Sequence, residues 1–339
     1  MKILVLGGTV FLGRHLVEAA LERGHDVAMF NRGRSNPGLF PDVERLLGDR
    51  DGDLAALGGR EWDAVVDLSG FVPRQVRAVG ERLGDGAGHY TFLSSVSVYP
   101  DQADKSEDAP VRALEDPGSE NVNRDYGGLK ALCERTVEEL YPGRALKVRS
   151  GLIAGPYDPT NRFTYWPVRL SAGGEVLAPD APDLPVQYID ARDEAAWILD
   201  MAEGGASGTF NVTGPASMLT FGEFLQSCLE VTGANARFTL VPEGFLGAHG
   251  VQPWTDMPLW LPQKLAIVHS CPVERALAAG LRLRPLEQTI ADTLAWGRQA
   301  GQAGPSEPQV DAGGRVRTPG GISPQREAEL LRHWHGERG

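Results

Sequence analysis

Short apolar runs alternate with amphipathic helical patterns through the first half of the chain. The apolar runs lie near 2–7, 26–30, 43–47, 63–68, 89–94 and 145–149. The helical patterns lie near 12–23, 52–58, 73–83 and 123–140. Buried parallel strands form continuous apolar runs, and helices connect them over the faces of the sheet. The alternation therefore predicts an α/β fold with a doubly wound parallel sheet of the Rossmann type.

This rhythm stops after residue 151. Residues 155–185 are rich in Pro, Gly and aromatic residues, and irregular stretches separate the later helical patterns. Those patterns lie near 191–203, 220–232 and 286–300. We expect the sheet domain over 1–155, a smaller substrate lobe over 156–300, and a tail over 301–339. The tail should contain a linker, because 301–321 is rich in Gly and Pro, and then a short helix over 324–333.

The first apolar run ends in glycines and leads directly into a helical pattern. The connecting segment is Gly7-Gly8-Thr9-Val10-Phe11-Leu12-Gly13. A parallel strand that turns into a helix in this way presents backbone N–H groups to a nucleotide phosphate, so we expect the whole segment to bind a dinucleotide. Val10 stands where the dinucleotide fingerprint has its middle glycine. Its side chain must therefore point away, or hold the pyrophosphate slightly further out.

The end of the second strand indicates which dinucleotide is preferred. An acidic residue usually follows that strand and bonds the adenosine ribose, but here the chain reads Asn31-Arg32-Gly33-Arg34. An arginine fork suits phosphate oxygens, so we expect NADP(H) in preference to NAD(H), with Asn31 and Arg32 at the cofactor. The alternative is that Arg32 and Arg34 are solvated loop residues. Two further pairs are expected at the cofactor from their positions alone, at the ends of the third and fourth strands: Asp49 and Arg50, then Ser69 and Gly70. Both pairs could equally be helix-cap or turn residues.

Tyr126 and Lys130 are candidates for acid/base chemistry. They are four residues apart in a long helical pattern and so share one face. A lysine at about 4 Å favours the phenolate by about 4 kcal/mol at an effective dielectric near 20, which is about three pKa units. Such a shift would bring the pKa of a tyrosine close to neutrality. The run Ser94–Tyr99 follows the fifth strand and offers hydroxyls at the same sheet edge. A surface helix pair is the alternative for Tyr126 and Lys130.

The combination resembles the extended short-chain dehydrogenase/reductase family, in the branch of NAD-dependent epimerases and dehydratases, over about residues 1–300. The motifs that carry it are Gly7-Gly8, Gly13, Ser95-x-x-x-Tyr99, Tyr126-x-x-x-Lys130 with Glu134, Gly151–Pro156 and Val186–Asp193. The resemblance implies hydride transfer at a carbinol or carbonyl carbon with Tyr126 as acid/base. It implies that Lys130 lowers the pKa of that tyrosine and bonds the nicotinamide ribose, and that Ser95 steadies the reacting oxygen. It also implies that Ile153 lies beside the nicotinamide, and it is compatible with a homodimer through helix 123–140.

The departures from the family pattern narrow the expected reaction. Sugar-nucleotide dehydratases of this branch have Asp-Glu directly after the strand-end hydroxyl, where this chain has Val96 and Ser97, so dehydration is not expected. Reduction and epimerisation remain, on a nucleotide sugar or a small carbonyl compound. The residues expected at the substrate are Ser97, Arg162, Tyr165, Trp166 and Gln187. For Trp166, packing between the lobes is the alternative, and Arg162 and Arg192 are candidates for binding a diphosphate.

Val10 and Asn31-Arg32-Gly33 also resemble a side branch that includes chloroplast stem-loop RNA-binding proteins, which lack the tyrosine–lysine pair. The competing hypothesis is therefore an RNA-binding protein on this scaffold without catalysis. The net charge of −12 and the acidic segment 101–120 argue against it, because both repel phosphates. We expect no nucleic-acid partner.

Composition adds few constraints to this picture. No run of about 18 apolar residues occurs, so we expect no membrane span. Three widely separated cysteines give neither a disulfide framework nor a zinc spacing, which favours a cytoplasmic location. His333 and His335 lack nearby ligand partners in the sequence, and we expect no metal site.

Overall fold

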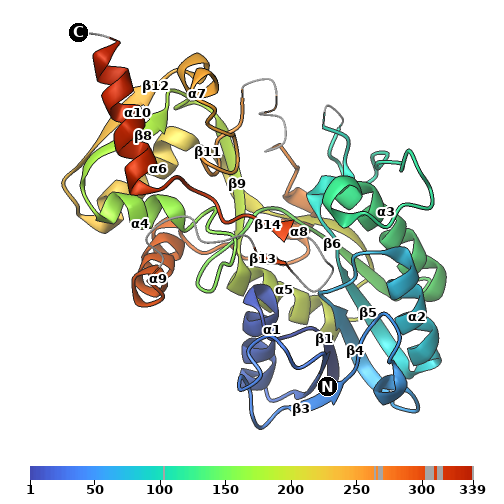
Figure 1. Cartoon of the computed structure of the whole chain (residues 1–339). Helices are drawn as coiled ribbons and strands as arrows, with labels where there is room; N and C mark the ends of the chain where they lie inside the picture. The colour runs from blue at the N-terminus through green and yellow to red at the C-terminus, as the bar shows by residue number, and fades with distance from the viewer. Residues whose placement is uncertain (102–103, 263–264, 266–269, 302–308, 311–315, 338–339) are drawn as a thin grey trace.

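The computed structural model describes residues 1–101, 104–262, 265, 270–301, 309–310 and 316–337. Figure 1 shows a sheet lobe that contains the N-terminus and a second lobe that carries the C-terminal helix. Segments at the centre of the view connect the two lobes.

The sheet lobe is built on seven parallel strands, and the apolar runs predicted six of them. Their order across the sheet is β10-β6-β5-β4-β1-β2-β3. The strands β2 and β3 lie on one side of β1 and the later strands on the other, so the strand order reverses at β1. Their bounds are β1 Lys2–Leu6, β2 Asp26–Asn31, β3 Glu44–Leu47, β4 Trp62–Asp67, β5 Ala87–Leu93, β6 Ala145–Ser150 and β10 Gly208–Val212. This topology confirms the doubly wound fold, and a ligand is expected where the strand order reverses.

Helices cover both faces of this sheet. The helices α1 (Phe11–Glu22) and α5 (Ala191–Glu203) pack on one face, and α2 (Pro73–Leu83) and α3 (Val122–Leu140) on the other. Alternate strand residues separate accordingly: Ile3 and Val5 pack with the α1 side, whereas Leu4 and Leu6 pack with the α2 side. A strand buried on both faces has no polar face, which is why the sequence reads as an unbroken apolar run.

Part of the expected substrate lobe belongs to this sheet. The helix α5 packs against α1, and β10 pairs with β6 at the sheet edge, so residues 191–212 complete the first lobe rather than the second. The strand β10 was missed because Gly208–Val212 is short and mixes polar with apolar residues. The helix expected near 52–58 is only one 3₁₀ turn, η1 (Ala55–Leu57). Two further 3₁₀ turns flank β5, η2 (Gly84–Gly86) and η3 (Val96–Val98).

The second lobe surrounds its own hydrophobic core, which includes Phe163, Trp166, Phe221 and Phe224. Two small sheets contribute, β12-β8 and β11-β9-β7. The strands are β7 Ile153–Ala154, β8 Gly174–Pro179, β9 Pro185–Asp190, β11 Gly214–Thr220 and β12 Ala236–Val241. The remaining helices before the tail are α4 Tyr165–Ser171, α6 Phe221–Thr232, α7 Glu243–Ala248, α8 Glu274–Ala278 and α9 Leu286–Gln299, of which α8 packs against β10 of the sheet lobe.

The tail returns to both lobes. The linker predicted over 301–321 lies partly outside the described residues. Its described parts include β13 (Gln309–Val310) and β14 (Val316–Arg317), which pair antiparallel near the middle of the view in Figure 1. The predicted terminal helix is α10, Pro324–Gly336. Among the residues that the structure describes, no helix is long and apolar enough to cross a membrane.

Candidate functional site

A cavity of about 350 Å³ lies at the carboxyl ends of β1, β2, β3 and β4, where the strand order reverses. Most residues expected at the cofactor line it: Gly7, Gly8, Thr9, Val10, Phe11, Leu12, Gly13, Asn31, Arg32, Asp49, Arg50, Ser69 and Ile153. Gly70 and Lys130 lie beside the cavity, and Lys130 Nζ donates a hydrogen bond of 2.7 Å to the Gly70 carbonyl. The structure therefore brings together residues from six separate segments of the sequence.

The segment 7–13, which we call the glycine loop, has the backbone conformation that a phosphate site needs. Gly7 and Gly8 adopt positive φ angles of 117° and 92°. A Cβ on Gly13 would lie 2.9 Å from the Gly8 Cα, so the start of α1 packs directly on the loop. Val10, at φ −130° and ψ 140°, has an extended conformation that any residue can adopt. The backbone conformation at this position therefore does not itself require glycine.

Val10 also leaves the helix donors available. It occupies the N-cap position of α1, and its side chain makes no capping hydrogen bond. The first N–H groups of a helix have no partner inside the helix, and an anion at that end satisfies them. A bound pyrophosphate would therefore meet no competing cap at this loop.

Asn31 stands where the ribose-binding acid usually stands, and its side chain makes two hydrogen bonds within the protein. Its Nδ2 donates to the Gly7 carbonyl at 2.9 Å, and its Oδ1 accepts from the Gly33 N–H at 2.9 Å. Asn36 Nδ2 donates to the Thr9 carbonyl at 2.7 Å, so the loop after β2 is tied twice to the glycine loop. The end of β2 thus presents no carboxylate to the cavity, and its amide serves to hold the loop.

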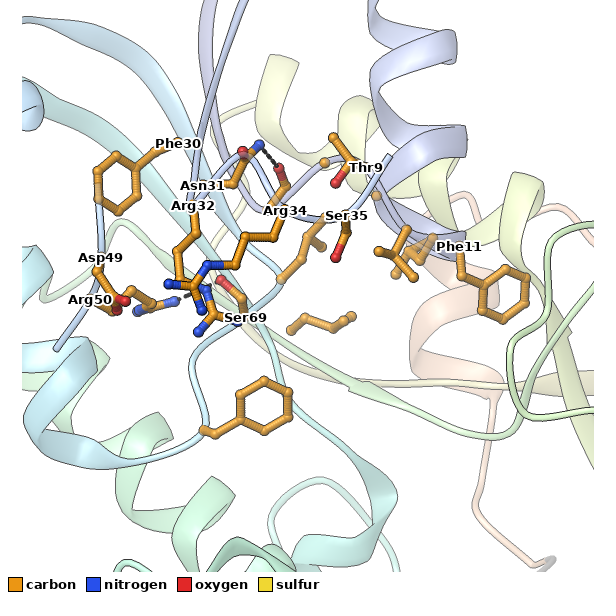
Figure 2. A pocket seen from close by; sticks show the side chains of 18 of the residues that line it. Thr9, Phe11, Phe30, Asn31, Arg32, Arg34, Ser35, Asp49, Arg50 and Ser69 are labelled. Carbon is orange, nitrogen blue, oxygen red and sulfur yellow. Dashed lines mark hydrogen bonds between the residues drawn. The ribbon is translucent and has the colours of Figure 1, made fainter. Parts of the chain in front are cut away.

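Two arginines from the loop after β2 extend into the same cavity. Arg32 and Arg34 are exposed, and neither makes a hydrogen bond or a salt bridge with the part of the chain that the structure describes. In Figure 2 their side chains extend toward the region of Arg50 and Ser69. Asp51, which lines the same cavity, interacts electrostatically with Arg32, but neither guanidinium bonds a carboxylate of the described residues directly, and such cations favour an anion beside them.

Arg50 has a structural role that its position in the sequence did not indicate. Its guanidinium is buried and binds Asp67 at both oxygens, at 2.5 and 2.7 Å, and it also donates to Ser69 Oγ at 3.1 Å. Burial opposes the charge on Asp67, but Arg50 outweighs this and holds the pKa of that carboxyl below its usual range. Tyr90 donates a further hydrogen bond to Asp67 at 2.9 Å. Arg50 therefore lines the cavity with one N–H of each Nη held by Asp67, while its buried Nε has no hydrogen-bond partner in the described part of the chain.

Several lining residues were not predicted from the sequence. They are Phe30, Gly33, Arg34, Ser35, Gly48, Asp51, Leu68, Phe71, Gln75, Leu93, Pro159 and Val310. Gln75 donates from Nε2 to both oxygens of Asp51, while its buried Oε1 has no hydrogen-bond partner in the described part of the chain. The available signal was positional: Gln75 lies in the first turn of the helix after β4, at the same sheet edge as Ser69.

Lys130 lies in the interior, beside the carboxyl ends of two strands. Its Nζ donates to the Gly70 carbonyl at 2.7 Å and to the Leu93 carbonyl at 2.6 Å, and the residue is 2% exposed. An ammonium group has three donors, so one N–H remains for another acceptor. This geometry fits a cofactor hydroxyl at the third donor, next to the cavity.

Tyr126 lies on α3 where this helix meets the loop after β5, residues 94–99, which we call the serine loop. Tyr126 is half-buried and directly follows Asp125, whose non-helical φ of −112° and ψ of 19° kink the helix. A Cβ on Gly127 would lie 2.0 Å from the Ser97 carbonyl oxygen, so the loop touches the helix beside Tyr126. Ser95 is half-buried, and its hydroxyl donates to Ser97 Oγ at 3.1 Å. The strand-end hydroxyls and the helix tyrosine thus belong to adjoining segments.

The substrate residues predicted from the sequence fall into different environments. Ser97 is exposed at the serine loop, and the Arg162 guanidinium lies 5.4 Å from the ring centre of Trp254. Gln187 is engaged, because its amide exchanges hydrogen bonds of 2.8 and 2.9 Å with the backbone of Cys271. Arg192, the other candidate for a diphosphate, is paired with Asp190 and Asp292.

Tyr165 and Trp166 are packing residues. Tyr165 is 3% exposed and Trp166 is fully buried in the core of the second lobe. The Trp166 indole donates to the Pro258 carbonyl at 2.7 Å. The expectation that Trp166 contacts a substrate is therefore corrected in favour of the packing alternative, and Tyr165 shares that environment. Within the described residues, no group of three or more His, Cys, Asp or Glu side chains is placed to hold a metal ion.

Comparison with known proteins finds relatives of this chain. The sequence model of the NAD dependent epimerase/dehydratase family matches residues 3–213. The chloroplast stem-loop binding protein of 41 kDa b from Arabidopsis thaliana is 26% identical over 260 residues, which cover 68% of this chain and 63% of that protein. UDP-glucose 4-epimerase from Neisseria meningitidis serogroup B is 26% identical over 175 residues, or 41% of this chain and 48% of the epimerase.

Solved structures show the same fold. Thermus thermophilus UDP-glucose 4-epimerase, solved in complex with NAD, has a TM-score of 0.61 at 18% identity over 88% of this chain and 100% of its own. Bordetella bronchiseptica WbmH, solved in complex with NAD⁺, has a TM-score of 0.64 at 17% identity over 88% of this chain and 99% of its own. The family match covers more than half of the chain, and the fold agrees with it. The chain belongs to the NAD dependent epimerase/dehydratase family, of the extended short-chain dehydrogenase/reductase type.

Proposed function

We propose that this protein is an NADP(H)-dependent oxidoreductase or epimerase that acts at a carbinol or carbonyl carbon, with Tyr126 as acid/base. The observation that carries the proposal is one cavity at the strand-order reversal that combines the glycine loop with Arg32 and Arg34. Beside it lie Lys130 and the contact between the serine loop and α3. The substrate class is a nucleotide sugar or a small carbonyl compound.

The chain's own residues divide the work of holding a dinucleotide. The N–H groups at the start of α1 would bind the pyrophosphate, and Arg32 with Arg34 would bind a 2′-phosphate. The third donor of Lys130 would bind a ribose hydroxyl, beside Ile153. When bound, the nicotinamide supplies or accepts hydride.

Proton transfer is assigned to Tyr126. Ser95 would donate a hydrogen bond to the substrate oxygen and fix its position, while Tyr126 gives or takes the proton on that oxygen. The positive charge of Lys130, four residues along the same helix, favours the phenolate. No second acid and base stand beside Ser95, because Val96 and Ser97 follow it, so elimination of water is not part of the proposal.

Replacing Tyr126 with Phe tests this assignment. We expect kcat to fall by about 10²–10⁴-fold, the range for loss of general acid/base catalysis, with the Kd for NADPH within about 2-fold of the wild type. Turnover is followed by NADPH absorbance with UDP- and dTDP-sugars and small carbonyl compounds. Tritium exchange or product analysis would detect epimerisation, which leaves the absorbance unchanged. Full activity of Y126F on any of these substrates would refute the role.

The cofactor preference has its own test. In the double variant R32Q/R34Q we expect the Kd for NADPH to rise by about 10–100-fold, the equivalent of one or two charge-assisted hydrogen bonds, with the Kd for NADH within about 3-fold. Arg237→Gln, which removes one positive charge from an exposed position on β12, is the control and should change neither value. Tighter binding of NADH than of NADPH by the wild type would contradict the preference.

RNA binding is the second candidate, because one relative is named a stem-loop binding protein. A filter-binding titration at two salt concentrations separates the candidates, since phosphate contacts weaken steeply with salt. We expect no saturable binding of a stem-loop RNA, together with saturable binding of NADPH. The opposite result would favour the RNA hypothesis.

A further inference from the structure

A buried ion pair behind the candidate site has no part in the chemistry described above. Arg149, near the end of β6, binds Glu134 on α3 through Nε at 3.0 Å and Nη2 at 2.8 Å. Both side chains are at most 7% exposed. Burying such a pair is costly unless the remaining donors and acceptors are also satisfied, so its other contacts indicate its role.

Those contacts lead to both ends of the serine loop. Ser94 Oγ donates to Glu134 Oε1 at 2.5 Å, and Arg149 Nη1 donates to the Tyr99 hydroxyl at 2.7 Å. Ser94 immediately precedes Ser95, and Tyr99 immediately follows the 3₁₀ turn that contains Ser97. The ion pair thus holds the two residues that bracket the candidate hydroxyls.

The Tyr99 end is anchored a second time. Its hydroxyl donates to Asn211 Oδ1 at 2.8 Å, and the Asn211 amide donates to the Lys105 carbonyl at 2.7 Å. Burial raises the pKa of Tyr99 to about 12 against the opposing effect of Arg149, so the phenol stays neutral and can donate and accept at once. The strand β10, which carries Asn211, therefore supports the same loop from the sheet edge.

One face of α3 carries the helix residues that the ion pair places relative to the serine loop. Tyr126, Lys130 and Glu134 follow each other at spacings of four residues and so lie along one side of the helix. Lys130 holds the Leu93 carbonyl and Glu134 holds the Ser94 hydroxyl, which are adjacent groups of the strand end. We propose that Glu134 and Arg149 are positioning residues that clamp both ends of the serine loop against α3 and so set the separation of Ser95 from Tyr126.

This inference rests on the proposed function, because it assigns the clamp to the reaction of Ser95 and Tyr126. Replacing Glu134 or Arg149 leaves the other charge buried without its partner, and such a variant could fail to fold. The test therefore removes only the two hydroxyls that the pair holds, with Ser94→Ala, Tyr99→Phe and the double variant. The control is Glu327→Gln, which neutralises one partner of the Arg169–Glu327 pair in the second lobe, where the remaining Arg169 is 17% exposed and keeps access to water.

We expect each single variant to lower kcat by about 10-fold and the double variant by about 10²-fold, the loss that a displacement near 1 Å can cause. The Kd for NADPH should stay within about 2-fold, because the glycine loop and the arginines are untouched. Glu327→Gln should lower Tm at least as much as the double variant, while its kcat stays at the wild-type value.

Hydrogen exchange supplies a readout that needs no substrate. Amides of 95–99 and 122–127 should exchange about 10-fold faster in the double variant than in Glu327→Gln. Unchanged exchange and kcat in the double variant would overturn the clamp, as would a kcat loss that Glu327→Gln reproduces at equal Tm. If the wild type turned over none of the substrates, the proposed function would fail, whereas faster exchange in the double variant would still support the clamp.

Discussion

At the scale of single residues, Glu194 is an ionisable group in surroundings that disfavour its charge. It lies on α5 and is fully buried. One carboxyl oxygen accepts from Ser150 Oγ, and the other has no hydrogen-bond partner in the described part of the chain. Burial raises the pKa of Glu194 to about 8, so the folded protein keeps this group protonated at neutral pH.

This shift predicts a loss of stability with rising pH. The folded state binds a proton that the unfolded chain releases near pH 4.5, so the free energy of unfolding falls between about pH 4.5 and 8, by up to about 1.4 kcal/mol per pH unit. Glu194→Gln should remove that slope and be more stable than the wild type at pH 9. Urea denaturation from pH 5 to 9 measures both proteins. Glu243→Gln, an exposed site on α7, should keep the wild-type slope; a parallel slope in E194Q would contradict the assignment.

Some residues of the cavity could be predicted from the sequence, and others could not. The glycine loop, Arg32 and Ser69 were found because each directly follows an apolar run, and parallel strands present such positions at one edge. The Arg50–Asp67 pair was not found, since each partner reads alone as an ordinary polar residue and only the pairing of β1 with β4 and β2 brings their segments together. Trp166 was ambiguous for a related reason, because an aromatic residue suits a core and a cleft equally well.

At the scale of elements, α3 depends on glycine for its contact with the serine loop. Gly127 and Gly128 are consecutive helix residues, a sequence that weakens a helix by about 1 kcal/mol per position relative to alanine. The compensation at Gly127 is the close approach of the Ser97 carbonyl. The sequence predicted the helix and the shared face of Tyr126 and Lys130, but the helical pattern held no sign of which face the loop would touch.

The two glycines make a matched pair of tests. A Cβ at Gly127 would lie 2.0 Å from a backbone oxygen, whereas one at Gly128 would lie 2.3 Å from Leu114 Cδ2, the end of a side chain that can rotate. Gly127→Ala should therefore displace the serine loop and lower kcat by about 10²-fold, while Gly128→Ala should lower it by less than about 3-fold. Steady-state kinetics with saturating NADPH measures both variants. Equal kcat values would show that the contact with the Ser97 carbonyl does not set the site.

At the scale of the whole molecule, the aromatic side chain of Tyr157 makes one of the contacts between the two lobes. The Tyr157 ring receives the Arg14 guanidinium of α1 at 3.6 Å on one side and contacts Trp296 of α9 with ring centres 5.7 Å apart. His15 Nε2 adds a contact to the Pro156 carbonyl at 3.0 Å. The sequence patterns predicted both lobes, but they could not predict this contact, which joins residues more than 130 positions apart.

Tyr157→Asn should loosen the lobes without disturbing the loop. Tyr157 has a φ of 70°, a conformation that asparagine tolerates, so the backbone is retained while the ring is lost. The lost cation–π and ring contacts predict a fall of about 1–2 kcal/mol in the free energy of unfolding. The Kd for NADPH should stay within about 2-fold, since most residues that line the cavity belong to the sheet lobe, whereas KM for the substrate should rise because the expected substrate residues Ser97 and Arg162 belong to different lobes. Met218→Asn, at a 78% exposed position on β11, is the control. A weakened Kd for NADPH with an unchanged KM would mean that Tyr157 supports the cofactor cavity rather than the union of the lobes.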